Sequence, residues 1–320
     1  MIQNFNRIVI AGLTLFLTAC GGGSNQVTDG SIGGTGMIAS GPISGFGSVF
    51  VNNIEFHIVP ATRITTDHNP HSSQSDLELG QVVNIRGTLN SDAVSGTASQ
   101  IEYGGIVRGP IEKIDAANNT IVVLGQLAQL TASTSLQGMT SIAELRLNDV
   151  VEISGFSDWR GTIVATYIER QGAFVPGSTT LTVRGTMAAV NPTTFLIGGE
   201  VIDYSGLLPQ NRPGRPLVDG LIVEVQSNEL PQNGILKATS VSIVDPTLGA
   251  NEGDQISIQG AISSVSSPMG FVVNAIEVVV DTQTVFQNGA VMHLANDLLV
   301  EIQGRWHAGQ VIARKVVFLQ

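Results

Sequence analysis

The residues with the clearest metal-ligating chemistry lie in one polar segment early in the chain. His57, Asp67, His68 and His71 supply imidazole nitrogens and a carboxylate, which are common zinc ligands. His68 and His71 stand three positions apart in the stretch DHNPH. The corresponding segments later in the chain hold no such set, and the single cysteine lies far from it. We therefore interpret the segment as an exposed polar loop and predict no metal site.

Carboxylates suited to acid–base catalysis also recur, but singly. Glu152, Glu224 and Glu301 stand in similar apolar stretches, VVEISG, IVEVQS and LVEIQG. Glycoside cleavage uses two carboxylates about 5–9 Å apart, and the sequence contains no G-x-S-x-G nucleophile motif. Because Val and Ile alternate with the glutamates, the pattern predicts strands with the glutamates on a solvated face. We expect no catalytic residues and a protein that is not an enzyme.

Glycines cluster in SGPISGFGSVFVNN, residues 40–53, and raise the question of a phosphate-binding loop. Such a loop lies between a strand and a helix and, in its Walker form, carries a lysine. The stretch has no lysine, and later segments that align with it hold DAANN and NPT, which are turn-forming sequences. We predict a turn here, no nucleotide site and no cofactor.

Charge and aromatic content restrict the partners. The chain has 15 basic and 26 acidic residues and a net charge of -11, whereas nucleic-acid binding depends on basic contacts to phosphate. Aromatic residues make up only 5%, and Trp159 and Trp306 follow the ISG and IQG glycines at corresponding places. We interpret both as hairpin packing. The alternative is an aromatic platform for a saccharide.

An internal repeat organises these residues into units. The segments LELGQVVNIRG (77–87), LRLNDVVEISG (145–155), LVDGLIVEVQS (217–227) and LANDLLVEIQG (294–304) match one another. Each lies between a segment that opens with a glycine and a closing strand. We therefore predict β-repeats at 37–105, 106–171, 181–245 and 255–320, called repeats 1 to 4 below.

Each repeat contains about five short stretches of alternating apolar and polar residues, and none shows helical periodicity with caps. Closing a small sheet into a barrel removes its exposed edges. The sequence therefore predicts an all-β fold, a tandem array of four small antiparallel β-barrels of OB-like type. A small sandwich is the alternative architecture.

A secretory leader precedes the repeats. Arg7 is followed by an apolar run that is too short to span a bilayer, which is typical of a signal peptide, here residues 1–19. The run ends in LTAC (17–20), which resembles a bacterial lipobox and implies cleavage before Cys20 and lipid attachment to it. Gly21 rather than Asp follows the cysteine, which implies the outer membrane, and residues 20–36 are interpreted as a Gly/Ser-rich tether.

The lipobox, the tether and SGPISGFGSVFVNNIEF resemble bacterial lipoproteins of the domain-of-unknown-function family 5666. The repeated L-x-x-G/N-x-x-V-x-V/I-x-G and A-x-x-I/V blocks are similar to later strands of the same family. The resemblance extends over the mature chain and is clearest in repeats 1 and 4. Repeat 3 departs from it at Ser227, which replaces the strand-end glycine, and in a Pro-rich insert. The family implies no activity and no functional residues.

These observations favour a non-enzymatic outer-membrane lipoprotein that binds or spaces other envelope components, with an envelope protein or glycan as partner. The alternative is a saccharide-binding surface lipoprotein. The segments before the fourth strands differ most between repeats, and loops on a rigid scaffold concentrate binding residues. We predict that Asp67, His68, His71, Arg212 and Arg215 contact the partner. Exposed linkers are expected near 105, 172–180 and 246–254.

Overall fold

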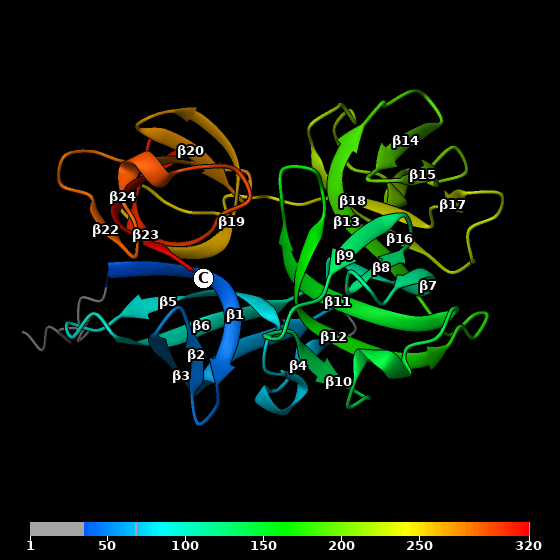
Figure 1. The fold of residues 1–320 in the computed structure, drawn as a ribbon, viewed down its shortest axis with the longest axis horizontal. Helices are drawn as coiled ribbons and strands as arrows, with labels where there is room; N and C mark the ends of the chain where they lie inside the picture. Colours follow the sequence, from blue (N-terminus) through cyan, green and yellow to red (C-terminus); the bar gives the residue numbers. More distant parts are fainter. Residues whose placement is uncertain (1–34, 68, 320) are drawn as a thin grey trace, which may run out of the picture. The chain divides into compact units, whose positions relative to one another are not determined.

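The computed structural model describes residues 35–67 and 69–319 of the chain. Over this part, strands and four short 3-10 helices follow one another, and the described residues include no α-helix (Figure 1). Each repeat contributes six strands, so the all-β prediction is confirmed. The segment predicted to be a signal peptide and most of the predicted tether lie outside the described residues. The last tether residues, Thr35 and Gly36, belong instead to the first strand.

The elements of repeats 1 and 2 follow the same order, with one 3-10 helix before the last two strands. Repeat 1 contains β1 (Thr35–Gly45), β2 (Val49–Val51), β3 (Ile54–Thr66), β4 (Asn69–Ser72), η1 (Gln74–Asp76), β5 (Val82–Leu89) and β6 (Ser95–Tyr103). Repeat 2 contains β7 (Val107–Asp115), β8 (Thr120–Val123), β9 (Gln126–Gln129), β10 (Ser135–Gln137), η2 (Ile142–Glu144), β11 (Asp149–Ser157) and β12 (Ile163–Ala173).

Repeat 4 keeps this order, whereas repeat 3 divides its closing strand in two. Repeat 3 contains β13 (Leu181–Ala188), β14 (Thr194–Ile197), β15 (Glu200–Asp203), η3 (Pro209–Asn211), β16 (Ile222–Ser227), β17 (Ile235–Lys237) and β18 (Ser240–Ile243). Repeat 4 contains β19 (Gln255–Ser267), β20 (Gly270–Val273), β21 (Ile276–Val279), β22 (Val285–Gln287), η4 (Val291–His293), β23 (Leu299–His307) and β24 (Gln310–Phe318).

Five strands close into a barrel in repeats 1, 2 and 4, whereas in repeat 3 the closing strand is divided between β17, which pairs with β15, and β18, which pairs with β16. In repeat 2, β7 pairs with β8 and β11, β9 pairs with β8, and β12 pairs with both β9 and β11. The β9–β12 pair is parallel and the others are antiparallel. Repeats 1 and 4 close in the same strand order. The array of OB-like barrels is therefore confirmed.

The barrels are joined through their sheets as well as along the chain. β1 runs parallel to β19 and joins repeat 1 to repeat 4, while β7 pairs with β13 and joins repeat 2 to repeat 3. Repeats 2 and 3 also share one apolar core, repeat 1 has a core of its own, and the repeat 4 core includes Ile38 from β1 of repeat 1. Repeats that are distant in sequence are consequently fixed against each other.

The strand-end glycines of the repeated block allow two strands to approach closely. At Gly155 the β11–β12 register shifts, and an added Cβ would stand 2.1 Å from the Val164 carbonyl oxygen. Gly87 and Gly304 sit at equivalent register shifts, with similar backbone collisions. Repeat 3 has Ser227 at this place, and there β16 ends without such a shift. The glycine therefore marks a β-bulge.

The expected linkers differ in exposure. Residues 173 and 175–178 are exposed, as an open linker requires. Gly105 is buried instead, and its amide donates to Asp67. The expectation of an exposed linker near 105 is therefore wrong, because the chain there is held between two repeats. Among the described residues, no helix has the length and apolar character to cross a membrane.

Candidate functional site

The alternating residues of β11 and β23, the strands of the repeated block in repeats 2 and 4, are oriented as predicted on one face only. Val151, Ile153, Val300 and Ile302 are completely buried, which confirms the predicted register. Glu152 and Glu301, however, are only 2% and 4% exposed. The interpretation of these two glutamates as solvated is wrong, because repeat 1 covers both of them: Tyr103 donates to Glu152, and Asn53 donates to Glu301.

On its outer face each repeat carries a cross-strand pair between its first strand and the strand of the repeated block, which is β5, β11, β16 or β23. The residue before the opening glycine lies opposite the glutamate position of the repeated block. The pairs are Ser40–Asn84, Arg108–Glu152, Arg184–Glu224 and Gln259–Glu301. Repeats 2 and 3 thus place an arginine beside a glutamate, whereas repeat 1 places two shorter uncharged side chains at the same position.

The Glu152 carboxylate joins repeat 1 to repeat 2. The Tyr103 hydroxyl donates to its Oε1 at 2.6 Å, and the Gln171 amide donates to its Oε2 at 3.1 Å. The Arg108 Nε lies 3.9 Å from Oε2. Burial, together with the neighbouring Glu152 charge, holds the pKa of the Tyr103 hydroxyl well above its usual range. Tyr103 therefore acts as a hydrogen-bond donor that orients Glu152.

The Asp67 carboxylate joins repeat 1 to repeat 3. Its Oδ2 accepts the Gly105 amide at 2.7 Å, and its Oδ1 lies 3.7 Å from Arg184. The same guanidinium donates to Glu224 at 2.5 Å. Burial raises the pKa of Asp67 to about 6 and outweighs the opposing attraction of Arg184. The junction therefore contains a carboxyl group that titrates near neutral pH.

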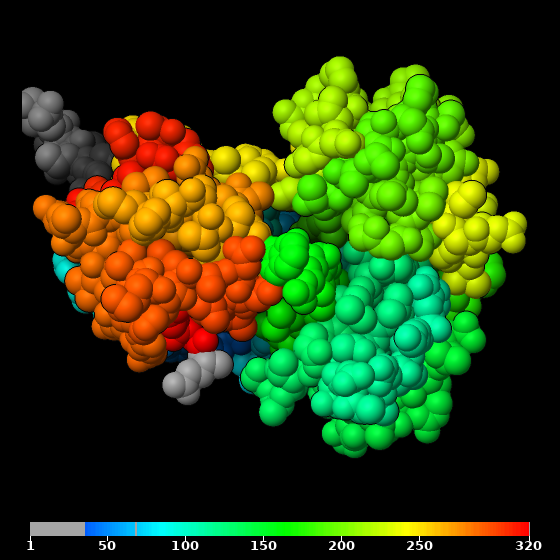
Figure 2. Space-filling model, turned by 45° about the horizontal axis from the view of Figure 1, so that its top comes forward, coloured from blue at the N-terminus to red at the C-terminus, as the bar shows by residue number. Residues whose placement is uncertain are grey.

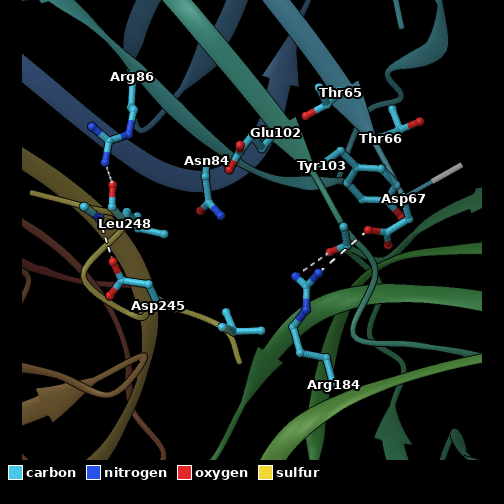
Figure 3. Close-up of a pocket in the computed structure, with 13 residues that line it drawn as sticks. Thr65, Thr66, Asp67, Asn84, Arg86, Glu102, Tyr103, Arg184, Asp245 and Leu248 are labelled. Carbon is cyan, nitrogen blue, oxygen red and sulfur yellow. Dashed lines mark hydrogen bonds and ion pairs between the residues drawn. The ribbon is translucent and has the colours of Figure 1, made fainter. Parts of the chain in front are cut away.

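A cavity of about 450 Å³ opens beside this junction (Figure 3). Its walls come from β3, β5 and β6 of repeat 1, from Arg184 on β13, and from the segment 244–249. Asn84 and Glu102 line it on the repeat 1 side, and Asp245 lines it on the opposite side. Arg86 bridges the two sides by donating to the Leu248 carbonyl. The cavity is thus a polar space built by distant segments.

Another buried carboxylate lies between repeats 2 and 3. Glu200 is 4% exposed, and its Oε1 has no hydrogen-bond partner among the described residues. Burial, with a smaller contribution from the Glu112 charge, raises its pKa to about 7. The turn that contains it packs against Gly125, whose carbonyl accepts the Gly199 amide at 3.1 Å. Sequence reasoning missed this group, because Glu200 occupies an ordinary strand position.

The residues predicted to contact a partner are not brought together. Cys20 and His68 lie outside the described residues. Asp67 is turned into the cavity, whereas His71 is exposed on β4. Arg212 donates to the carbonyls of its own loop at Leu207, Tyr204 and Ser205, and Arg215 is exposed. Their proposed contact with a partner stays a prediction. Within the described ranges no three His, Cys, Asp or Glu side chains group as metal ligands would.

The two tryptophans have different environments. Trp306 is buried in the repeat 4 core, as expected for packing. Trp159 is 49% exposed at the β11–β12 turn, and its Nε1 donates to Asp297 of repeat 4 at 2.8 Å. In Figure 2 the green hairpin lies against the orange surface of repeat 4. Hairpin packing is therefore the wrong interpretation for Trp159, which forms a contact between repeats.

Comparisons with known proteins agree with the repeat structure. Residues 35–102, 108–169 and 259–317 match the family model described as Domain of unknown function (DUF5666). These ranges fall in repeats 1, 2 and 4 and omit repeat 3, which lacks the bulge glycine and divides its closing strand. No curated protein is significantly similar to the chain.

Among solved structures, the chain is similar to one titled "drosophila Unr CSD456", at 13% identity and a TM-score of 0.19. That match covers 66% of this chain and 97% of the other. The three family matches together cover more than half of the 320 residues. The chain therefore belongs to the family described as Domain of unknown function (DUF5666).

Proposed function

We propose that the chain is a non-enzymatic lipoprotein of the bacterial outer membrane whose four barrels form a binding unit of the cell envelope. The LTAC motif at 17–20 and Gly21 support attachment through Cys20 and retention in the outer membrane. The net charge of -11 makes nucleic acid and anionic lipid surfaces poor partners.

The observation that carries the binding role is the joining of distant repeats around a polar space. The β1–β19 pair and the Asp67–Arg184 contact hold repeat 1 against repeats 4 and 3. Repeats joined by flexible linkers would suit an extended spacer. Repeats fixed against each other instead present surfaces of constant geometry, which favours recognition of a partner. This supports binding over spacing.

A saccharide-binding lipoprotein is the second candidate. The cavity beside Asp67 favours it, because hydroxyl, amide and carboxylate groups line the space together.

Lipid attachment is tested by labelling cells with a fatty-acid analogue. We expect the wild-type protein to take up label and Cys20→Ser to remain an unlabelled precursor, because no other cysteine is present. Ser24→Ala, four residues further on, is the matched control and should be labelled normally. Labelling of Cys20→Ser at the wild-type level would overturn the lipoprotein proposal.

The partner is tested by photo-crosslinking in intact cells from His71 and Arg215, which are exposed. Replacing 69–75 by Gly-Ser residues should reduce recovery of the partner crosslinked from Arg215. Because this range includes β4, which pairs with β3, a melting curve checks that the variant is folded. Crosslinking from the exposed Glu277 on β21 serves as the control. Equal recovery from all three positions would contradict contact through these loops.

A further inference from the structure

We infer that the cavity between repeats 1 and 3 binds a neutral saccharide of one or two rings. The inference rests on the proposed binding role and names its ligand class. The volume of about 450 Å³ lies within the range of small-molecule sites, ~300–1,000 Å³.

The cavity lies where repeat 1 lacks the long charged side-chain pair of repeats 2 and 3. At the cross-strand position where repeats 2 and 3 carry an arginine–glutamate pair, repeat 1 carries Ser40 and Asn84. In repeat 3 the long side chains of that pair fill the junction by bonding to each other and to Asp67. The shorter pair in repeat 1 leaves the outer face of its sheet open to the cavity.

Three side chains on that open face stand side by side on neighbouring strands. Thr65 on β3 lies opposite Glu102 on β6, which lies opposite Asn84 on β5. Thr65 Oγ1 and the Asn84 amide have no hydrogen bond to any described residue, and Gln100 donates to only one Glu102 oxygen, Oε1. The row offers a hydroxyl, a carboxylate and an amide. Sugar hydroxyls both donate and accept, so vicinal hydroxyls complement such a row.

The charges of the lining disfavour an anionic ligand. Arg86 and Arg184 are the cationic side chains of the lining. Arg86 donates to the Leu248 carbonyl, and Arg184 pairs with Glu224 and Asp67. Because Glu102 and Asp245 add further negative charge, an anionic ligand would meet net repulsion. Tyr103 is only 5% exposed and offers no stacking platform. Recognition therefore depends on hydrogen bonds.

The inference is tested by calorimetric titration of the full mature chain with neutral disaccharides, using maltose, cellobiose and diacetylchitobiose. Glucuronic acid and glucosamine serve as charged probes. We expect saturable binding of a neutral sugar and weaker binding of glucuronic acid, whereas tighter binding of glucosamine than of every neutral sugar would overturn the assignment of a neutral ligand. Glu102→Gln should weaken the affinity about tenfold, because hydrogen bonds to charged groups exceed neutral ones by that order.

Two further variants make the result specific. Glu277→Gln changes the same residue type at an exposed position of β21 and should bind like the wild type. Thr65→Trp places a large side chain in the cavity and should abolish binding while the melting temperature shows a folded protein. Absence of binding by all neutral sugars, preference for glucuronic acid, or full binding by Thr65→Trp would each overturn the inference. Fatty-acid labelling at Cys20 tests the lipoprotein proposal by a separate measurement, so the lipoprotein proposal and the saccharide inference can fail independently.

Discussion

Asp67→Asn is expected to stabilise the protein at neutral pH and to flatten part of its pH dependence. In the folded protein the Asp67 pKa is about 6, against an ordinary value of 3.8. The folded state therefore holds the proton more tightly, so the stability contribution is complete below pH 4 and is lost as the pH rises through 6. A difference of about 2 pKa units corresponds to about 3 kcal/mol between pH 4 and pH 8.

Asparagine imitates the protonated carboxyl group and retains an acceptor for the Gly105 amide. The urea-unfolding free energy of Asp67→Asn should therefore exceed that of the wild type by up to about 3 kcal/mol at pH 8 and match it at pH 4. Glu200, whose pKa is also raised, contributes equally to the unfolding free energy of both proteins, so its contribution cancels in the difference between their stability–pH curves. The exposed Glu277→Gln serves as the control. A variant that matches the wild type at pH 4 and becomes less stable than the wild type as the pH rises to 8 would refute the reasoning, because the ion pair with Arg184 would then outweigh burial.

Three further predictions concern the junctions and the bulge. Glu152→Ala should lower the unfolding free energy by about 3–5 kcal/mol in urea titration, because it removes a buried acceptor of Tyr103 and a charge beside Arg108. A change below about 0.5 kcal/mol would mean that Glu152 is exposed to solvent. Gly155→Ala should cost about 1–3 kcal/mol through the collision with the Val164 carbonyl, and a neutral effect in thermal melting would contradict the bulge. Limited proteolysis should cut first within 172–180 and spare 105, as mass spectrometry of early fragments would show.

The strands and their inward residues were predictable because alternation is a local property. Val151 and Ile153 face the core as the pattern indicated. Alternation also shows that Glu152 faces the other way, but it does not show whether water or another repeat covers that face. The contacts between repeats depend on surfaces that only the folded barrels create.

A signal for the junction was present in the repeats themselves. Arg108 and Arg184 precede the opening glycines, and their cross-strand partners, Glu152 and Glu224, occupy one position of the repeated block. Opposite charges at recurring positions of two strands predict a cross-strand pair once the barrel order is known. Asp67 could not be assigned in this way, because its partner belongs to another repeat and its loop has no counterpart.

Amide hydrogen exchange of Gly105 tests most directly whether the repeats form one unit around the junction. This amide donates to Asp67 at the boundary between repeats 1 and 2, and Asp67 also lies beside Arg184 of repeat 3. We expect protection comparable to that of core strand amides in the wild type and rapid exchange in Asp67→Ala. Rapid exchange of Gly105 in the wild type would mean that the repeats are independent beads, and would contradict the account.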